Sequence, residues 1–161
     1  MIDLSSNPSF FLLPPLLRDT KTVQFDLYHV HLPMAFSFKT AKTAIEERET
    51  IIVRATAQDG SVGYGECVSF ATPFYTEETL NRSWSFMEQA LIPALFRPQE
   101  GRHPLADFHA LEKEASSMPM AVAAVENALL DVSGRQGGHN TVTAVCGQTL
   151  QATIPLGVAL G

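Results

Sequence analysis

Charged residues are scarce in this sequence. Its 161 residues include 11 Lys and Arg and 17 Asp and Glu, so charged residues make up 17% of the chain and the formal net charge is −6. A typical soluble domain carries about 25% charged residues. Because the few basic residues form no cluster that could neutralise a run of phosphates, the composition argues against a nucleic-acid partner. We expect such a chain either to bury much of its surface against another domain or molecule, or to be poorly soluble by itself.

Cysteines and long apolar runs are also scarce. Cys67 and Cys146 form neither a C-x-x-C pair nor a disulfide framework, which predicts two buried or inert thiols in a reducing compartment. The longest apolar run, residues 10–17, contains two prolines, whereas about 18–20 apolar residues are needed to span a bilayer. No basic segment precedes this run, as a secretory signal would require. We therefore predict a cytoplasmic protein with no membrane partner.

Hydrophobic residues make up 45% of the chain, which is enough for the core of one domain. Residues 1–20 lack periodicity and are interpreted as an irregular N-terminal extension. Three β-branched or aromatic segments, residues 22–32, 49–57 and 61–69, are predicted strands, with a loop over residues 33–43. The Asp59-Gly60 pair between the last two segments is typical of a hairpin turn.

Three helices are expected after the strands. Thr76 is the predicted N-cap of the first, with Glu77 and Glu78 in its first turn. Pro93 is expected to break or kink this helix. Its apolar stripe would be Leu80, Trp84, Met87 and Leu91. A second helix is predicted from Pro104, with the stripe Leu105, Phe108 and Leu111.

The third helix has the most regular pattern, and its flanking alanines predict packing on more than one face. Gly134 is its expected C-terminal stop. Its apolar stripe would be Met118, Val122, Val125, Leu129 and Val132. Residues 153–161 then alternate as a strand that has no later partner. The predicted fold class is α+β: a three-stranded antiparallel meander, a helical bundle and one orphan strand at the C-terminus.

Candidate chemistry is sparse. His29 and His31 would share one face of a strand, a spacing that can chelate a metal ion. No carboxylate or cysteine lies nearby in sequence to complete a site, so the favoured interpretation is two histidines on a half-exposed sheet face.

Two further motifs are more consistent with structural roles. Gly63 and Gly65 lack the third glycine of a phosphate-binding fingerprint and instead suggest a bulge or a close backbone approach. Glu126 and Asp131 would lie about 140° apart around a helix, so they do not converge on one point. We expect them to cap a neighbouring element or to pair with an arginine of another element.

Four stretches in this order carry a family resemblance: GYGECVSFATPFYTEET at 63–79, LIPAL at 91–95, MPMAVAAVENALLD at 118–131 and IPLGVALG at 154–161. Together they resemble the o-succinylbenzoate synthase / N-acylamino acid racemase branch of the enolase superfamily. The resemblance implies a capping domain over residues 21–150 and the first strand of a (β/α) barrel over residues 151–161. A complete barrel takes about 250 residues, so we expect the chain to be truncated relative to the family.

The resemblance also implies a chemistry. In the family, barrel carboxylates hold Mg²⁺, and one of two lysines removes the proton next to the carboxylate of a small-molecule substrate. The outcome is a dehydration in menaquinone biosynthesis or a racemisation. We expect none of these catalytic residues or metal ligands in this chain, and therefore expect it to be inactive without the missing barrel domain.

The resemblance further implies that two loops shape the substrate pocket. Phe38 and Thr40 match the first, at residues 33–43, although Lys42-Thr43 replaces the usual aromatic-glycine pair. Phe70 and Tyr75 match the second, at residues 67–75, unless they are only loop-anchoring core. On the barrel strand, Ala159 stands where the family often has a hydroxyl residue.

Two questions stay open at this point. The alternative function is a non-catalytic module that binds a small molecule or a protein through the capping domain. The sequence also leaves open whether the chain forms a homo-oligomer.

Overall fold

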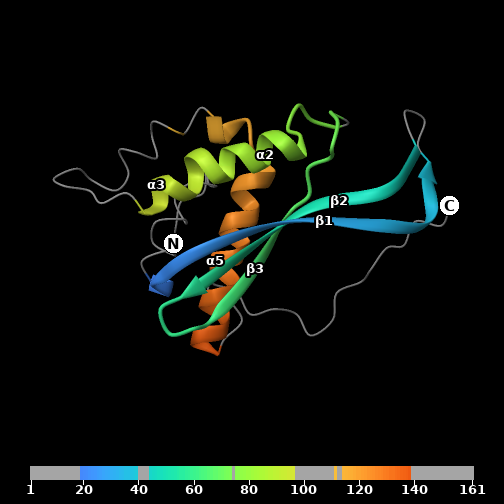
Figure 1. The fold of residues 1–161 in the computed structure, drawn as a ribbon. Helices are drawn as coiled ribbons and strands as arrows, with labels where there is room; N and C mark the ends of the chain where they lie inside the picture. Colours follow the sequence, from blue (N-terminus) through green and yellow to red (C-terminus); the bar gives the residue numbers. More distant parts are fainter. Residues whose placement is uncertain (1–18, 40–43, 74, 97–110, 112–113, 139–161) are drawn as a thin grey trace, which may run out of the picture.

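The computed structural model describes residues 19–39, 44–73, 75–96, 111 and 114–138. Three strands, β1 (Thr22–Lys39), β2 (Ala44–Ala57) and β3 (Val62–Cys67), form one antiparallel sheet in the order β1-β2-β3 (Figure 1). The predicted meander and the α+β class are therefore confirmed. The predicted orphan strand at 153–161 lies outside the described residues, as does the helix expected from Pro104 except for half-buried Leu111.

The turn between β2 and β3 is the predicted Asp-Gly turn. The Gly60 amide donates a hydrogen bond to the Ala57 carbonyl at 3.0 Å, and its φ of 85° is one that glycine adopts without strain. The Asp59 carboxylate accepts hydrogen bonds from the Ser61 amide at 2.9 Å and from the Gln136 side chain at 2.8 Å. These bonds, the Ser61 amide first, lower the pKa of Asp59.

The prediction of a loop at residues 33–43 is wrong for residues 33–39, the part of it that the structure describes. β1 continues to Lys39, and β2 begins at Ala44 rather than at Glu49. The pairing shifts register between Pro33 and Phe38. Because β1 is an edge strand, a proline without an N–H group can stand in it without breaking the ladder. The two strands thus form a longer hairpin than the residue pattern predicted.

The next element is a continuous helix in three parts, α2 (Leu80–Phe86), η1 (Met87–Leu91) and α3 (Ile92–Phe96). The expected apolar stripe is confirmed, but the N-cap is Thr79, not Thr76. Pro93 does not break the helix. The Ile92 amide reaches back to the Met87 carbonyl in a π-type turn, and this wider turn leaves room for the proline ring one residue later.

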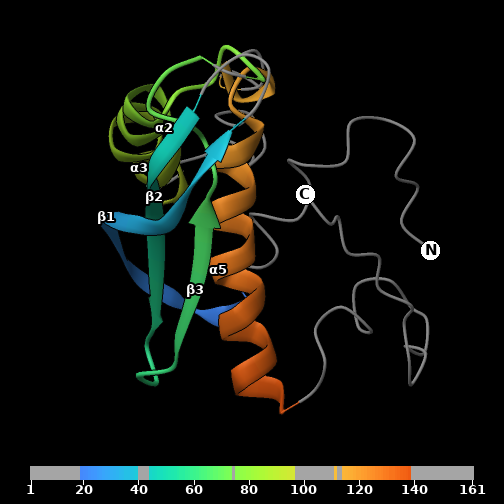
Figure 2. The ribbon, with the colours of Figure 1, turned by 90° about the vertical axis from the view of Figure 1, so that its right-hand side faces the viewer.

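The long helix α5 (Pro119–Gly137) lies along β3 and covers one face of the sheet (Figure 2). It ends at Gly138, in the left-handed conformation with φ of 60°, rather than at the predicted Gly134. A β-carbon on Gly63 or Gly65 would overlap the α5 backbone, at the carbonyls of Ala128 and Ala124 respectively. The predicted close backbone approach at these glycines is therefore confirmed.

The sheet has an inner half and an outer arm. The inner half, where β3 pairs with residues 51–56 of β2, packs under α5 and α2. The outer arm, residues 30–39 of β1 and 44–50 of β2, has no β3 partner and extends away from the helices (Figure 1). Within the described part of the chain, no helix is long and apolar enough to cross a membrane.

Candidate functional site

A pocket of about 450 Å³ lies between the outer arm and the segment that follows β3. Residues 44–49 of β2 and residues 70–73 line this arm pocket. Residues 70–73 belong to the second predicted loop, whereas the lining residues of β2 lie after the first predicted loop, residues 33–43.

Arg48 ties these two segments together. Its guanidinium donates hydrogen bonds to the carbonyls of Val68 at 2.7 Å and Ser69 at 3.3 Å. It also lies 4.7 Å from the ring centroid of Phe70, within the range of a cation–π contact. Sequence reasoning missed Arg48 because the predicted strand began one residue later. A β2 strand extended by one residue would have included Arg48. The register of the β1–β2 hairpin then places Arg48 beside the second loop.

Buried hydroxyl and thiol groups fix the base of the second loop. The Thr50 hydroxyl lies 2.9 Å from the carbonyl oxygen of Cys67, and the Cys67 Sγ lies 3.3 Å from the Ser69 Oγ. The Ser83 Oγ of α2 lies 3.1 Å from the Ser69 Oγ. Since buried polar groups must be hydrogen-bonded to avoid a desolvation cost, this chain of contacts determines where the loop leaves the sheet.

Glu78 ends this network and corrects a prediction. It does not sit in the first turn of its own helix; its Oε1 and Oε2 accept the amide N–H groups of Ala121 and Met120, each at 2.9 Å. The Ser83 hydroxyl donates to the same carboxylate at 2.9 Å. A carboxylate at a helix N-terminus satisfies free amides and opposes the helix dipole. Glu78 thus caps α5, and it couples the loop to the core.

The predicted pocket residues fall at or near the arm pocket where the structure describes them. Phe70 is half-buried and lines the pocket, with its ring centroid 6.1 Å from that of Tyr75. Tyr75 is 72% exposed. Phe38 pairs in register with Ile45, which lines the pocket. Thr40 and Ala159 lie outside the described residues.

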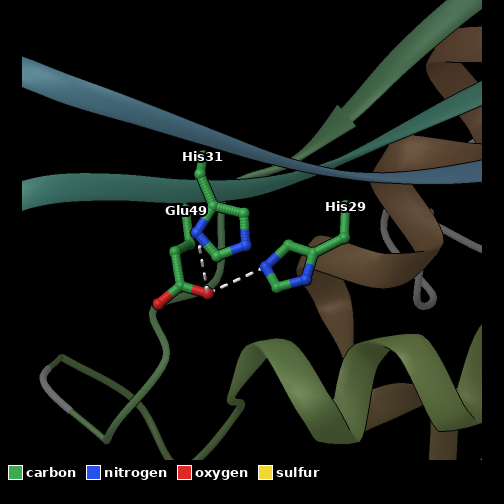
Figure 3. A group of neighbouring side chains, drawn as sticks. All are labelled: His29, His31 and Glu49. Atoms are coloured by element: carbon green, nitrogen blue, oxygen red, sulfur yellow. Dashed lines mark hydrogen bonds and ion pairs between the residues drawn. The ribbon is translucent and has the colours of Figure 1, made fainter.

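The two histidines meet carboxylates that are distant in sequence (Figure 3). The antiparallel register sets His31 opposite Glu49, and the Glu49 Oε2 lies 2.8 Å from the His29 Nε2 and 3.9 Å from the His31 Nδ1. The Glu47 Oε1 lies 3.4 Å from the His31 Nδ1. The predicted half-exposed face is confirmed, and β2 brings to the histidine pair a carboxylate, Glu49, that does not lie nearby in sequence.

This cluster does not match the magnesium site that the resemblance implies. Among the described residues it is the group of His, Cys, Asp and Glu whose ligand atoms all lie within 4.8 Å of one another. Two of its three donors are imidazole nitrogens, whereas Mg²⁺ takes oxygen ligands. The donor set of this cluster therefore does not fit Mg²⁺.

The two α5 carboxylates play separate roles. Asp131 accepts the Tyr64 amide at 2.9 Å and the Arg135 Nε at 3.0 Å, which confirms a structural role, although Arg135 belongs to the same helix. The Glu126 Oε1 is buried and has no hydrogen-bond partner among the described residues. This burial raises the pKa of Glu126 to about 7.

Comparison with known proteins shows the family to which this domain belongs. Residues 22–143 match the family "Mandelate racemase / muconate lactonizing enzyme, N-terminal domain", and the chain belongs to that family. Its relatives lie in the o-succinylbenzoate synthase / N-acylamino acid racemase branch of the enolase superfamily.

Two curated relatives and one solved structure illustrate the match. An o-succinylbenzoate synthase of Geobacillus kaustophilus is 32% identical over 135 residues, covering 84% of this chain and 35% of the relative. An N-succinylamino acid racemase of Amycolatopsis sp is 29% identical over 136 residues, covering 84% of this chain and 36% of the relative. A probable mandelate racemase of Alicyclobacillus acidocaldarius superposes with a TM-score of 0.62 at 30% identity, covering 76% of this chain and 33% of that one. The chain thus spans about a third of the length of the relatives it matches.

Proposed function

We propose that this chain is the capping portion of an enolase-superfamily enzyme of the o-succinylbenzoate synthase / racemase type. In this proposal the arm pocket closes over the mouth of a catalytic barrel and contacts the part of the substrate beyond its carboxylate. Magnesium and the proton-abstracting lysines belong to the barrel, so the 161-residue chain by itself does not turn over substrate.

The observation that carries the proposal is the convergence of Phe70 and the outer arm on one pocket, within a domain of this family. The arm also exposes apolar side chains that the described residues leave uncovered. They are Leu32, Met34, Phe36 and Phe38. Exposed apolar side chains gathered in one region indicate an interface with another domain or molecule. In this proposal the arm forms that interface with the barrel and its substrate.

The chain's own residues would act by positioning and by excluding water. Arg48 holds Phe70 against the strand, so the aromatic wall of the pocket is formed before substrate arrives. The network from Ser69 to Glu78 anchors the loop to α5. A preformed wall lowers the cost of ordering the loop on binding, and closing it over the barrel strengthens electrostatic interactions in the active site.

A chimeric enzyme tests this function. Residues 22–143 would replace the matching segment of the Geobacillus kaustophilus o-succinylbenzoate synthase, and Mg²⁺-dependent dehydration and racemisation would both be assayed. We expect activity in the chimera and none in the 161-residue chain alone. In the chimera, Phe70→Ala should lower kcat/KM about tenfold or more, because it removes an apolar wall of the pocket.

Tyr64→Ala is the matched control, since Tyr64 is an exposed aromatic residue on β3 that does not line the arm pocket. Its kcat/KM should stay within about twofold of the parent chimera. Equal losses in the two variants would refute a substrate-facing role for Phe70. Turnover by the isolated chain would refute the division of labour between cap and barrel.

A further inference from the structure

We propose that His29, His31 and Glu49 form a binding site for a divalent transition-metal ion of the Zn²⁺ type. The site lies at the base of the outer arm. It would link β1 to β2 immediately beside the arm pocket, because Glu49 also lines that pocket.

The spacing of the ligand atoms fits such an ion. In a tetrahedral site with metal–ligand bonds of about 2.0–2.1 Å, ligand atoms stand about 3.3 Å apart. The distances from the Glu49 Oε2 to the two histidine nitrogens, 2.8 and 3.9 Å, lie on either side of this value. Small side-chain rotations would bring all three donors to equal distance from one ion.

The donors converge because of the strand geometry. Residues two apart on a strand point to the same side of the sheet, so His29 and His31 project together, and their ring centroids are 4.3 Å apart. Figure 3 shows both rings turned toward the Glu49 carboxylate from the neighbouring strand. The backbone pairing of β1 and β2 therefore holds the three groups near one another before any ion binds.

A fourth donor is within reach. The Glu47 Oε1 lies 3.4 Å from the His31 Nδ1, close to the tetrahedral ligand spacing. Two imidazoles with one or two carboxylates suit Zn²⁺ and its neighbours in the first transition series. All four side chains are partly exposed, so an ion can enter from solvent.

Zn²⁺ binding to the 161-residue chain, measured by equilibrium dialysis, tests the site. We expect the His29→Gln/His31→Gln double variant to lose at least about tenfold in affinity, and Glu49→Gln to lose a comparable factor, since even outer-shell changes cost about 10–100-fold. Glu46→Gln is the matched control. By strand alternation Glu46 points to the opposite side from Glu47 and Glu49, so its affinity should be unchanged.

Hydrogen exchange of the unmodified chain gives a second readout that needs no variant. Saturating Zn²⁺ should slow amide exchange around residues 29–31 and 47–51 but not in the Asp59–Gly60 turn. Wild-type affinity in the double variant, no binding by the unmodified chain at molar excess of Zn²⁺, or protection confined to other regions would each overturn the proposal. The barrel chemistry does not enter these measurements, so their outcome is separate from that of the proposed function.

Discussion

The inner half of the sheet and its outer arm belong to the same two strands, yet different forces hold them. In the inner half, Ile51, Val53 and Ala55 are fully buried under the helices. In the outer arm, the equivalent positions carry Glu47 and Glu49, which face the histidines of β1. Apolar burial fixes the first region, while backbone pairing and polar cross-strand contacts hold the second.

This difference separates stability from recognition. Close packing in the inner half leaves no space for larger side chains at two glycines of β3, because the α5 backbone contacts the β3 backbone there. The outer arm is free to present side chains to a partner, since little of the core depends on their identity. Substitutions in the two regions should therefore have very different costs.

The largest effect is expected for Gly65→Ala in the inner half. The added β-carbon would overlap the Ala124 carbonyl oxygen, so α5 would have to move away from β3. We expect a loss of about 3 kcal/mol or more in the free energy of unfolding, measured by urea denaturation. The control is Gly60→Ala, where no atom lies within 4 Å but φ is 85°; backbone strain alone should cost about 1–2 kcal/mol. Equal losses would mean that the contact between α5 and β3 is not tight.

A smaller, pH-dependent effect is expected for Glu126→Gln. The pKa of Glu126 in the folded chain, about 7, lies above the ordinary value of 4.5, so the folded state binds this proton more tightly than the unfolded state. The Glu126 contribution to stability is therefore present below about pH 4.5 and is lost as the pH rises through about 7.

The full difference in pKa would correspond to about 3 kcal/mol, and because the Glu126 side chain is only partly buried, solvent screening reduces it to roughly 1–2 kcal/mol. We expect Glu126→Gln to match the parent near pH 4 and to be more stable by this amount near pH 8, in urea denaturation at both pH values. A constant difference between the two proteins across this range would contradict the burial of this carboxyl.

The smallest effect is expected in the outer arm. Phe36 is 78% exposed, so Phe36→Ala should change the free energy of unfolding by less than about 0.5 kcal/mol. The matched core substitution, Leu129→Ala, removes a fully buried side chain and should cost about 2–5 kcal/mol. If thermal or urea unfolding gave the two variants similar losses, the arm would be packed in the isolated chain and the contrast between the regions would fail.

Much of the inner half could be predicted because its signals are local. The Asp59-Gly60 turn, the β-branched segments around it and the regular apolar stripe of α5 each depend on residues close together in sequence. The close approach at Gly63 and Gly65 was also predictable, since glycine inside a strand often marks a place where another backbone comes near. Phe70 was reached through family resemblance rather than through its own spacing.

The predictions that failed concern where elements end and what meets across them. The pattern predicts a loop over residues 33–39 because Pro33 interrupts the strand pattern, although Met34, Phe36 and Phe38 alternate with small or polar residues. The pattern predicts a stop at Gly134, whereas the helix is capped at Gly138, because composition does not reveal which glycine takes a left-handed conformation. The role of Glu78 was assigned to the wrong helix, since its partners lie more than forty residues away.

The sequence by itself determined the class of the fold and the family. Only the tertiary structure decided that residues 44–49 and 70–73 line one pocket, that Arg48 contacts the loop after β3, that Glu78 caps α5, and that Glu49 lies beside the two histidines. The physical reason is the range of the interactions. Periodicity, turns and caps act within a few residues, whereas hydrogen bonds and metal ligands are set by the strand register and helix packing that bring distant residues together.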